Sequence, residues 1–293
     1  MSGISNLQQD KYGLKTIFHV VVGLIIFIAV GALATSSVKL LRAAKVAEPS
    51  ILFSVVRPTL VIVVLLLVVC LYISKVLKRP LSDFRMGKPK HIALWGACAL
   101  ILPLAVAAFY IFLTPGNFAS SNAGMRENSL TILYVFFGTF LTAGVIEETI
   151  FRGLIMRVLE IRFGKVIAVI VPSIVFALMH IGNAANMHAT DIALLIIAGT
   201  AVGSMFSLIA MQSGSIVASA LVHGAWNMIL GGKILSIATQ PEPSIFTYKL
   251  TSDANLLTGG AFGIDAALPA IIGYGSVIAL ALYLMRKGDK SAQ

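Results

Sequence analysis

Long apolar runs limit what this chain can fold into more than any other feature of its sequence. Eight of them approach or reach the roughly 20 residues that a helix needs to cross a bilayer. Lipid offers the backbone no hydrogen-bond partners, so only helices or closed barrels can span it, and the alternating strands of a membrane barrel are absent. We therefore expect an all-α polytopic membrane protein, a bundle of about eight transmembrane helices, at roughly 17–38, 58–77, 92–114, 129–150, 166–182, 190–211, 214–232 and 266–285.

The composition excludes an ordinary soluble domain. Hydrophobic residues make up 58% of the 293-residue chain and charged residues 12%, against about 45–50% and about 25% in soluble domains. The net charge of +10 is carried mainly by short segments between the apolar runs, which is typical of membrane orientation signals rather than of a nucleic-acid partner. Cys70 and Cys98 both lie in apolar runs and form neither a disulfide framework nor a CxxC metal motif.

The distribution of Lys and Arg predicts the orientation in the membrane. With the N-terminus inside, 15 of the 22 basic residues fall in cytoplasmic segments and 7 in external ones, so we expect both termini to be cytoplasmic. The first apolar run is longer than a signal-peptide core, and we expect it to be a retained helix. We predict an N-terminal region of about three helices at 1–128, a core at 129–232, and an external loop with the last helix at 233–293. A Gly199–Gly203 pair predicts close helix packing.

Ionisable residues inside membrane spans are costly and by default indicate a functional site. The candidates are Glu147, Glu148 and Arg152 in the fourth run, His180 in the fifth, and His223 with Asn227 in the seventh. Glu148 and Arg152 are four residues apart, so they share a helix face and can pair. Glu147 points about 100° away from Glu148 on an α-helix and is free for another task. His223 and Asn227 likewise share one face.

A helical hairpin that turns at Gly164 would bring these groups together. Glycine is a natural helix terminator, and Gly164 lies near the midpoint between Glu147 and His180. Both side chains would then lie at nearly the same depth, roughly 24 Å from the hairpin tip at 1.5 Å per residue. His223, on a helix that rises from the same side, reaches a similar level. The three runs therefore predict one intramembrane site.

Three motifs in this part of the chain resemble the CPBP family of intramembrane endopeptidases, also called the CAAX-protease and bacteriocin-processing (Abi) family. They are EExxxR in GVIEETIFRG, FxxxH in FALMH and HxxxN in LVHGAWN. Each motif alone is weak, but the three together in this order are specific. The resemblance covers about residues 129–232. It implies a bundle of roughly eight helices with an intramembrane active-site cavity that opens to the cytoplasm and the lipid.

The resemblance also implies roles for the motif residues. Glu147 would activate water for attack on a peptide carbonyl, and His180 would assist that water. His223 and Asn227 would donate hydrogen bonds to the oxyanion, while Glu148, Arg152 and Phe176 would support the geometry of the motifs. Preorganised donors of this kind contribute about 3–4 kcal/mol each in other acyl-transfer sites.

Metal use is left open by the sequence. Glu147, His180 and His223 match the two-histidine, one-glutamate pattern of a catalytic zinc site, but a metal-free glutamate mechanism gives Asn227 a clear task and is favoured, so no cofactor is expected. The HExxH and GxGD motifs of other intramembrane proteases are absent.

We expect a membrane-associated protein or peptide substrate, a bilayer environment and no nucleic-acid partner. Because the chain is short, we also expect it to lie in a bacterial plasma membrane. Two rival hypotheses remain. One is a non-catalytic bacteriocin self-immunity or scaffold protein that uses the same cavity for binding, and the other is a proton-coupled transporter, for which no inverted repeat is detectable.

Overall fold

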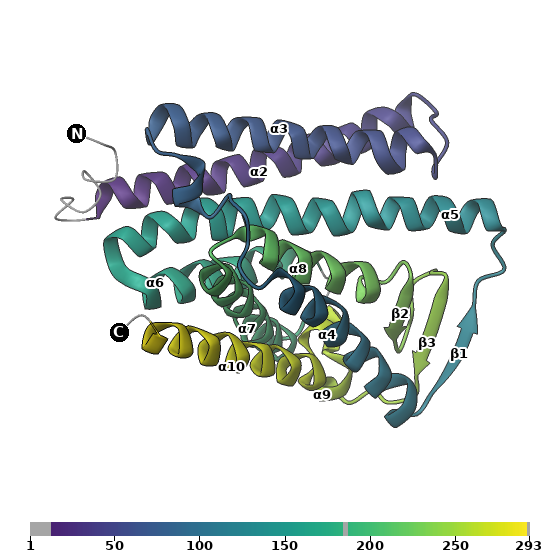
Figure 1. The fold of residues 1–293 in the computed structure, drawn as a ribbon. Coiled ribbons are helices and arrows are strands. Elements are labelled where there is room, and N and C mark those ends of the chain that lie inside the picture. The colour runs from purple at the N-terminus through teal and green to yellow at the C-terminus, as the bar shows by residue number, and fades with distance from the viewer. Residues whose placement is uncertain (1–12, 184–186, 292–293) are drawn as a thin grey trace.

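The computed structural model describes residues 13–183 and 187–291 and is dominated by long helices (Figure 1). The main helical elements in chain order are α2 (Leu14–Ala43), α3 (Arg57–Leu71) between the π-helical segments η1 (Leu52–Val56) and η2 (Tyr72–Val76), α4 (Ile92–Leu113), α5 (Met125–Tyr134), η4 (Val135–Leu141), η5 (Ala143–Ile155), α6 (Met156–Met179), α7 (Ala189–Ser213), α8 (Ile216–Leu230) and α10 (Leu268–Ser291). Short helical segments complete the set: η3 (Leu81–Phe84), η6 (Ile181–Asn183), α9 (Asn255–Thr258), η7 (Gly260–Phe262) and η8 (Ile264–Ala266).

All eight apolar runs expected from the sequence are helical. Six helices of the described residues are long and apolar enough to cross a membrane, and the one at Met125–Asn183 contains two of the predicted runs. The run at Ile216–Leu230 forms a shorter apolar helix. The all-α polytopic membrane fold is therefore confirmed, whereas the count of eight crossings stays a prediction.

The predicted hairpin turn at Gly164 is present. Gly164 interrupts α6 with φ 82° and ψ 177°, a conformation that is open essentially only to glycine. The chain reverses there, so that the second leg of α6 runs back along η5, as the left side of Figure 1 shows. A Cβ at Gly164 would meet no neighbouring atom, so the backbone conformation, and not a close contact, is what requires glycine.

The long helix α5–η4–η5 separates two layers of helices (Figure 1). One side is covered by α2 and α3, and their shared core with η5 includes Leu65, Ile73 and Phe151. The other side holds α4, α7, α8 and α10, whose core includes Trp95 and Trp226. Large apolar side chains in the middle of the helices, such as those of Ile28, Leu67 and Leu104, remain on the outside of the bundle, as expected for helices that face lipid.

Two glycines allow α7 to lie directly against α6. A Cβ built at Gly199 would come within 2.7 Å of the Ala177 Cβ, and one at Gly203 within 2.8 Å of the Ser173 Cβ. Lipid tails are as apolar as the side chains, so close van der Waals contact between small residues is a main source of helix association. The predicted glycine pair therefore packs helices inside the bundle.

A three-stranded sheet at one end of the bundle was not predicted. Its strands are β1 (Gly116–Ser120), β2 (Leu235–Ala238) and β3 (Phe246–Leu250), in the order β1-β3-β2. β1 pairs with β3 antiparallel with Gly116 opposite Leu250, while β2 runs parallel to β3. The Tyr248 hydroxyl donates to the Thr114 carbonyl at 2.7 Å. The sheet thereby joins the α4–α5 connection to the long loop between α8 and α10.

Candidate active site

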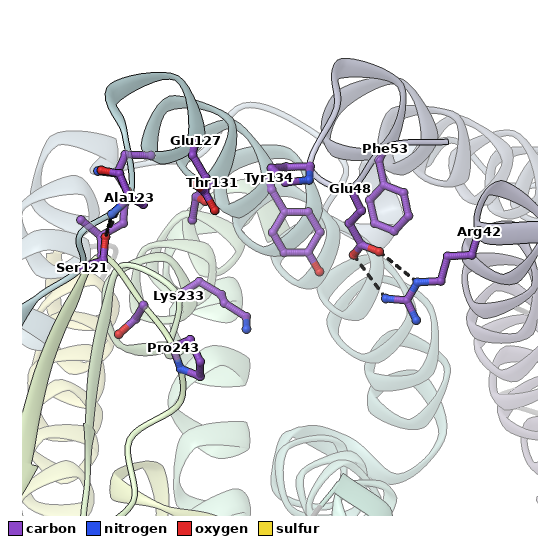
Figure 2. Close-up of a pocket in the computed structure, with 14 residues that line it drawn as sticks. Arg42, Glu48, Phe53, Ser121, Ala123, Glu127, Thr131, Tyr134, Lys233 and Pro243 are labelled. Atoms are coloured by element: carbon purple, nitrogen blue, oxygen red, sulfur yellow. Dashed lines mark hydrogen bonds and ion pairs between the residues drawn. The ribbon is translucent and has the colours of Figure 1, made fainter. Parts of the chain in front are cut away.

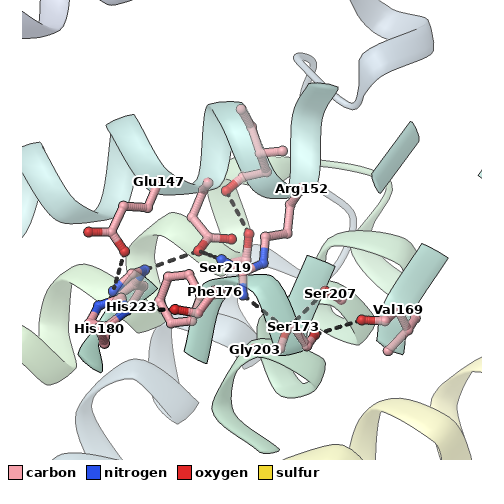
Figure 3. Close-up of polar contacts among 12 residues, drawn as sticks. Glu147, Arg152, Val169, Ser173, Phe176, His180, Gly203, Ser207, Ser219 and His223 are labelled. Atoms are coloured by element: carbon pink, nitrogen blue, oxygen red, sulfur yellow. Dashed lines mark hydrogen bonds and ion pairs between the residues drawn. The ribbon is translucent and has the colours of Figure 1, made fainter. Parts of the chain in front are cut away.

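The EExxxR motif lies on η5, a π-helical stretch of 13 residues. The sequence predicts an ordinary α-helix there, and this expectation is wrong in detail. In a π-helix each N–H bonds to the carbonyl five residues earlier, so the turn is wider than in an α-helix. Such segments are rare in proteins, and those that occur are often found at functional sites. From this segment the Glu147 side chain points toward His180 and His223 (Figure 3), and Glu148 Oε1 lies 3.0 Å from His223 Nδ1 of α8.

Glu148 and Arg152 form the predicted pair, and it is fully buried. Glu148 Oε1 accepts a hydrogen bond from the Arg152 guanidinium at 2.8 Å, with the two side chains 0% and 1% exposed. A second guanidinium nitrogen donates to the Gly203 carbonyl of α7 at 3.0 Å. The guanidinium carbon also lies 4.8 Å from the centre of the Phe176 ring. Arg152 thus connects η5, α6 and α7 at one point in the low-dielectric interior.

His223 connects this pair to the cavity. Its Nδ1 lies 3.0 Å from Glu148 Oε1, and an ionised carboxylate only accepts, so Nδ1 donates. Its Nε2 lies 3.8 Å from Glu147 Oε2, too far for a hydrogen bond but close enough for both to contact one small polar group. The ring stacks on Phe206 with centroids 4.4 Å apart. Glu148 and Phe206 therefore fix the orientation in which His223 presents Nε2 to Glu147.

His180 is held by the other residue of its own motif. It caps the C-terminal end of α6, and its Nδ1 lies 2.7 Å from the Phe176 carbonyl oxygen. A carbonyl only accepts, so Nδ1 carries the proton and Nε2 is left for another partner. The rings of Phe176 and His180 are 4.5 Å apart. Phe176 therefore contacts both His180 and the Arg152 guanidinium.

One cavity of about 330 Å³ brings the four predicted catalytic residues together: Glu147, His180, His223 and Asn227 all line it. The Glu147 side chain is 18% exposed, yet its Oε2 is buried and has no hydrogen-bond partner. A buried carboxylate oxygen without a partner is costly. Its position beside a cavity is typical of an atom that a bound molecule satisfies.

Asp265, which no sequence motif indicates, also lines this cavity. It lies on η8, where its Oδ1 accepts a hydrogen bond from the Trp226 indole N–H at 2.8 Å. Burial raises the pKa of the Asp265 carboxyl above its ordinary value, and the Trp226 hydrogen bond opposes this shift. Phe262 on η7 lies 6.3 Å, ring to ring, from His180. Neither residue belongs to a motif, and a lone Asp before the last apolar run gives no signal in the sequence.

The geometry does not provide a metal site in its present arrangement. Among the described residues, no group of three or more His, Cys, Asp and Glu side chains is close enough together to hold an ion. Glu147 and the two histidines do supply the donor types that zinc prefers, and the hydrogen bond from His223 Nδ1 to Glu148 leaves Nε2 available for another partner.

Comparison with known proteins agrees with the motifs. Residues 129–229 match the family model described as type II CAAX prenyl endopeptidase Rce1-like. No curated protein matches the chain. The matched segment contains Glu147, His180, His223 and Asn227, whereas Asp265 lies beyond it. Over residues 129–229, about a third of the chain, the protein is therefore similar to the type II CAAX prenyl endopeptidase Rce1-like family.

Proposed function

We propose that the protein is an intramembrane endopeptidase that hydrolyses a peptide bond of a membrane-associated protein or peptide with water activated by Glu147. The observation that carries the proposal is the unpartnered Glu147 Oε2 in a cavity that His180, His223 and Asn227 also line. An accepting carboxylate oxygen is suited to take a proton from water, and a general base must lie within hydrogen-bond reach of that proton.

The other three residues have complementary tasks in the proposal. His180, whose Nδ1 is engaged by the Phe176 carbonyl, directs Nε2 to the attacking water. Asn227 donates its amide N–H to the oxyanion. His223 donates from Nε2 when its ring carries both protons, because an imidazolium donates from both nitrogens. Donors fixed in place before the reaction stabilise the transition state without reorganisation.

The Glu148–Arg152 pair acts through His223 in this mechanism. Glu148 Oε1 is shared between the Arg152 guanidinium and His223 Nδ1, so it fixes the imidazole without facing the substrate. Arg152 in turn holds Glu148 and the Gly203 carbonyl. Both are positioning residues. Their loss is expected to disturb the angle at which His223 meets the oxyanion.

A library of lipid-anchored peptides in proteoliposomes tests the proposal. The purified full-length protein is expected to cleave a subset of the peptides, and one oxygen-18 atom from labelled water should enter each new carboxyl terminus. Glu147→Gln removes the base with little change in volume and is expected to abolish cleavage. Glu127 is exposed on α5, so Glu127→Gln serves as the matched control and should retain cleavage.

A chelator added to the same assay tests the metal-free form of the mechanism. Activity that persists in the chelator, and that zinc does not increase, is the expected result. Activity that disappears with the chelator and returns with zinc would replace the mechanism by a metal-assisted one. Binding of peptides by both wild type and Glu147→Gln without any cleavage would instead favour a non-catalytic binding protein.

A further inference from the structure

The connections at one end of the bundle are strongly basic and are held together by direct contacts. Arg85, in the α3–α4 connection, pairs with Glu160 at 2.6 Å, and the Lys90 N–H donates to the Ser213 carbonyl at 2.8 Å. A Cβ at Gly13 would lie 2.7 Å from the Phe163 ring. The start of α2, the α3–α4 connection, the Gly164 turn and the α7–α8 turn therefore form one face, termed here the basic face.

The two ends of the bundle differ in their numbers of Lys and Arg. Twelve such residues of the described chain lie at the basic face: Lys15, Lys75, Lys78, Arg79, Arg85, Lys88, Lys90, Arg157, Arg162, Lys165, Arg286 and Lys287. Seven lie toward the other end: Lys39, Arg42, Lys45, Arg57, Arg126, Lys233 and Lys249. The excess of Lys and Arg in short segments next to membrane helices marks the cytoplasmic side, so the basic face is expected to be cytoplasmic.

The opposite end, termed here the sheet face, carries β1, β2 and β3 (Figure 1). A separate hollow of about 480 Å³ at this end is lined by residues of both signs, including Arg42, Glu48, Glu127 and Lys233 (Figure 2). Arg42 and Glu48 pair there at 2.9 Å. Basic and acidic groups are thus mixed at the sheet face, whereas the basic face has a clear cationic excess.

The candidate active-site cavity lies toward the sheet face. Its walls include Asn183 just after α6, Gly231 just after α8, and Phe262 with Asp265 from the connection between β3 and α10. All of these are at helix ends or loops on the sheet side. Within the described chain, none of the residues that line the cavity comes from the connections that make up the basic face.

Two expectations from the sequence therefore exclude each other. If both termini are cytoplasmic, as the Lys and Arg distribution predicts, the basic face is cytoplasmic and the cavity points away from the cytoplasm. If the cavity opens to the cytoplasm, as the family resemblance implies, the basic face is external and the charge rule is reversed. The basic face and the cavity lie on opposite sides of the membrane in either case, because α5 runs from the sheet face to the basic face and α8 runs back.

We infer that the cavity opens to the non-cytoplasmic side of the membrane and receives a peptide segment that is exposed on, or has been translocated to, that side. The charge difference between the two faces decides between the alternatives. The inference names the substrate side for the proposed endopeptidase and rests on that function only for the act of cleavage. A prenylated tail held on the cytoplasmic leaflet would not reach Glu147 in this orientation.

Cysteine labelling of the full-length protein in intact cells tests the inference without requiring activity. The background carries Cys70→Ala and Cys98→Ala, which remove both native thiols. Asn122→Cys reports the sheet face and Ser82→Cys the basic face, since both positions are exposed and uncharged. Asn183→Cys reports the cavity mouth. The probe is a membrane-impermeant maleimide, applied before and after permeabilisation.

The expected result is labelling of Asn122→Cys and Asn183→Cys in intact cells to the level seen after permeabilisation, with Ser82→Cys labelled only after permeabilisation. The reverse pattern would overturn the inference, and so would equal labelling of Asn122→Cys and Ser82→Cys in intact cells, because the protein would then have no single orientation. If Asn183→Cys is protected throughout, the Asn122/Ser82 pair still decides the orientation. A variant that does not reach the membrane is replaced by its exposed neighbour, Gly124→Cys for Asn122 or Gly87→Cys for Ser82.

Peptide cleavage in sealed proteoliposomes of known orientation separates this inference from the proposed function. Cleavage only of peptides added at the basic face would overturn the inference while the endopeptidase function stands. Labelling as expected, with no cleavage of peptides from either side, would support the inferred orientation and contradict the proposed endopeptidase function.

Discussion

Replacement of Glu148 by Gln measures how strongly the stability of the bundle depends on its buried Glu148–Arg152 ion pair. Gln keeps the volume of Glu but removes its charge, which leaves the Arg152 guanidinium, 1% exposed, without a carboxylate. Its remaining acceptors, the Gly203 carbonyl and the amide oxygen of the new Gln, are both neutral. Removal of one partner of a buried pair costs about 3–5 kcal/mol, because the other charge stays in a low-dielectric site. We expect thermal unfolding in detergent to shift down by roughly 10 °C.

Two further variants make the result specific. Glu48→Gln breaks an ion pair of nearly the same length, but its side chains are 40% and 63% exposed, so the expected cost is below about 1 kcal/mol. The double variant Glu148→Met with Arg152→Met removes both charges and should recover much of the lost stability. It should stay inactive, because His223 no longer has an acceptor for Nδ1. Equal shifts for Glu148→Gln and Glu48→Gln would refute the reasoning.

Three other predictions concern separate parts of the site. Asn227→Ala is expected to lower kcat, measured on any cleaved peptide, by about 10²–10³-fold with little change in the unfolding temperature. An unchanged kcat would show that Asn227 does not bind the oxyanion. Gly199→Ala should destabilise the bundle by about 1–3 kcal/mol because its Cβ overlaps α6. Gly31→Ala, with open space around it, should not destabilise it, and equal unfolding temperatures of the two variants would contradict this reasoning. Because burial raises the pKa of Asp265 above 3.8, the folded state holds this proton more tightly, so its contribution to stability falls as the pH rises from about 4 through the folded pKa. Asp265→Asn should therefore remove this dependence of the unfolding temperature on pH, whereas Asp253→Asn, at an exposed position, should keep it. If the dependence survives in Asp265→Asn, another group causes it.

The helical framework was predictable because its physical cause is local. A run of apolar residues in lipid must form its own backbone hydrogen bonds, so each helix follows from composition over about 20 residues. The reversal at Gly164 and the α6–α7 contact at Gly199 follow from glycine alone. The meeting of Glu147, His180 and His223 also followed, since hairpin geometry fixes depth once the turn is known.

Other features depend on interactions between distant parts of the chain. β1 and β3 are separated by more than 120 residues and pair only after the helices between them have packed, so neither strand has a sufficient local signal. The π-helical form of η5 occurs together with contacts of Arg152 with α7 and of Glu148 with α8. Asp265 reaches the cavity through a loop, and its partner Trp226 lies 39 residues earlier.

The orientation of the cavity is a third case, because it requires both kinds of information. Basic residues indicate which face is cytoplasmic from the sequence alone. The mouth of the cavity can be assigned to a face only once Asn183 and Asp265 are seen beside Glu147. Charge and structure together therefore predict the side from which a substrate approaches.

The most direct test of the central claim compares peptide termini in host membranes by mass spectrometry, between cells with wild-type protein and cells with Glu147→Gln at matched expression. Uncut precursors that accumulate only in the Glu147→Gln cells are the predicted result, and they would identify the substrate and the position of the cut relative to the bilayer. Identical termini in both membranes, together with a phenotype that Glu147→Gln does not alter, would contradict proteolysis and make the cavity a binding site.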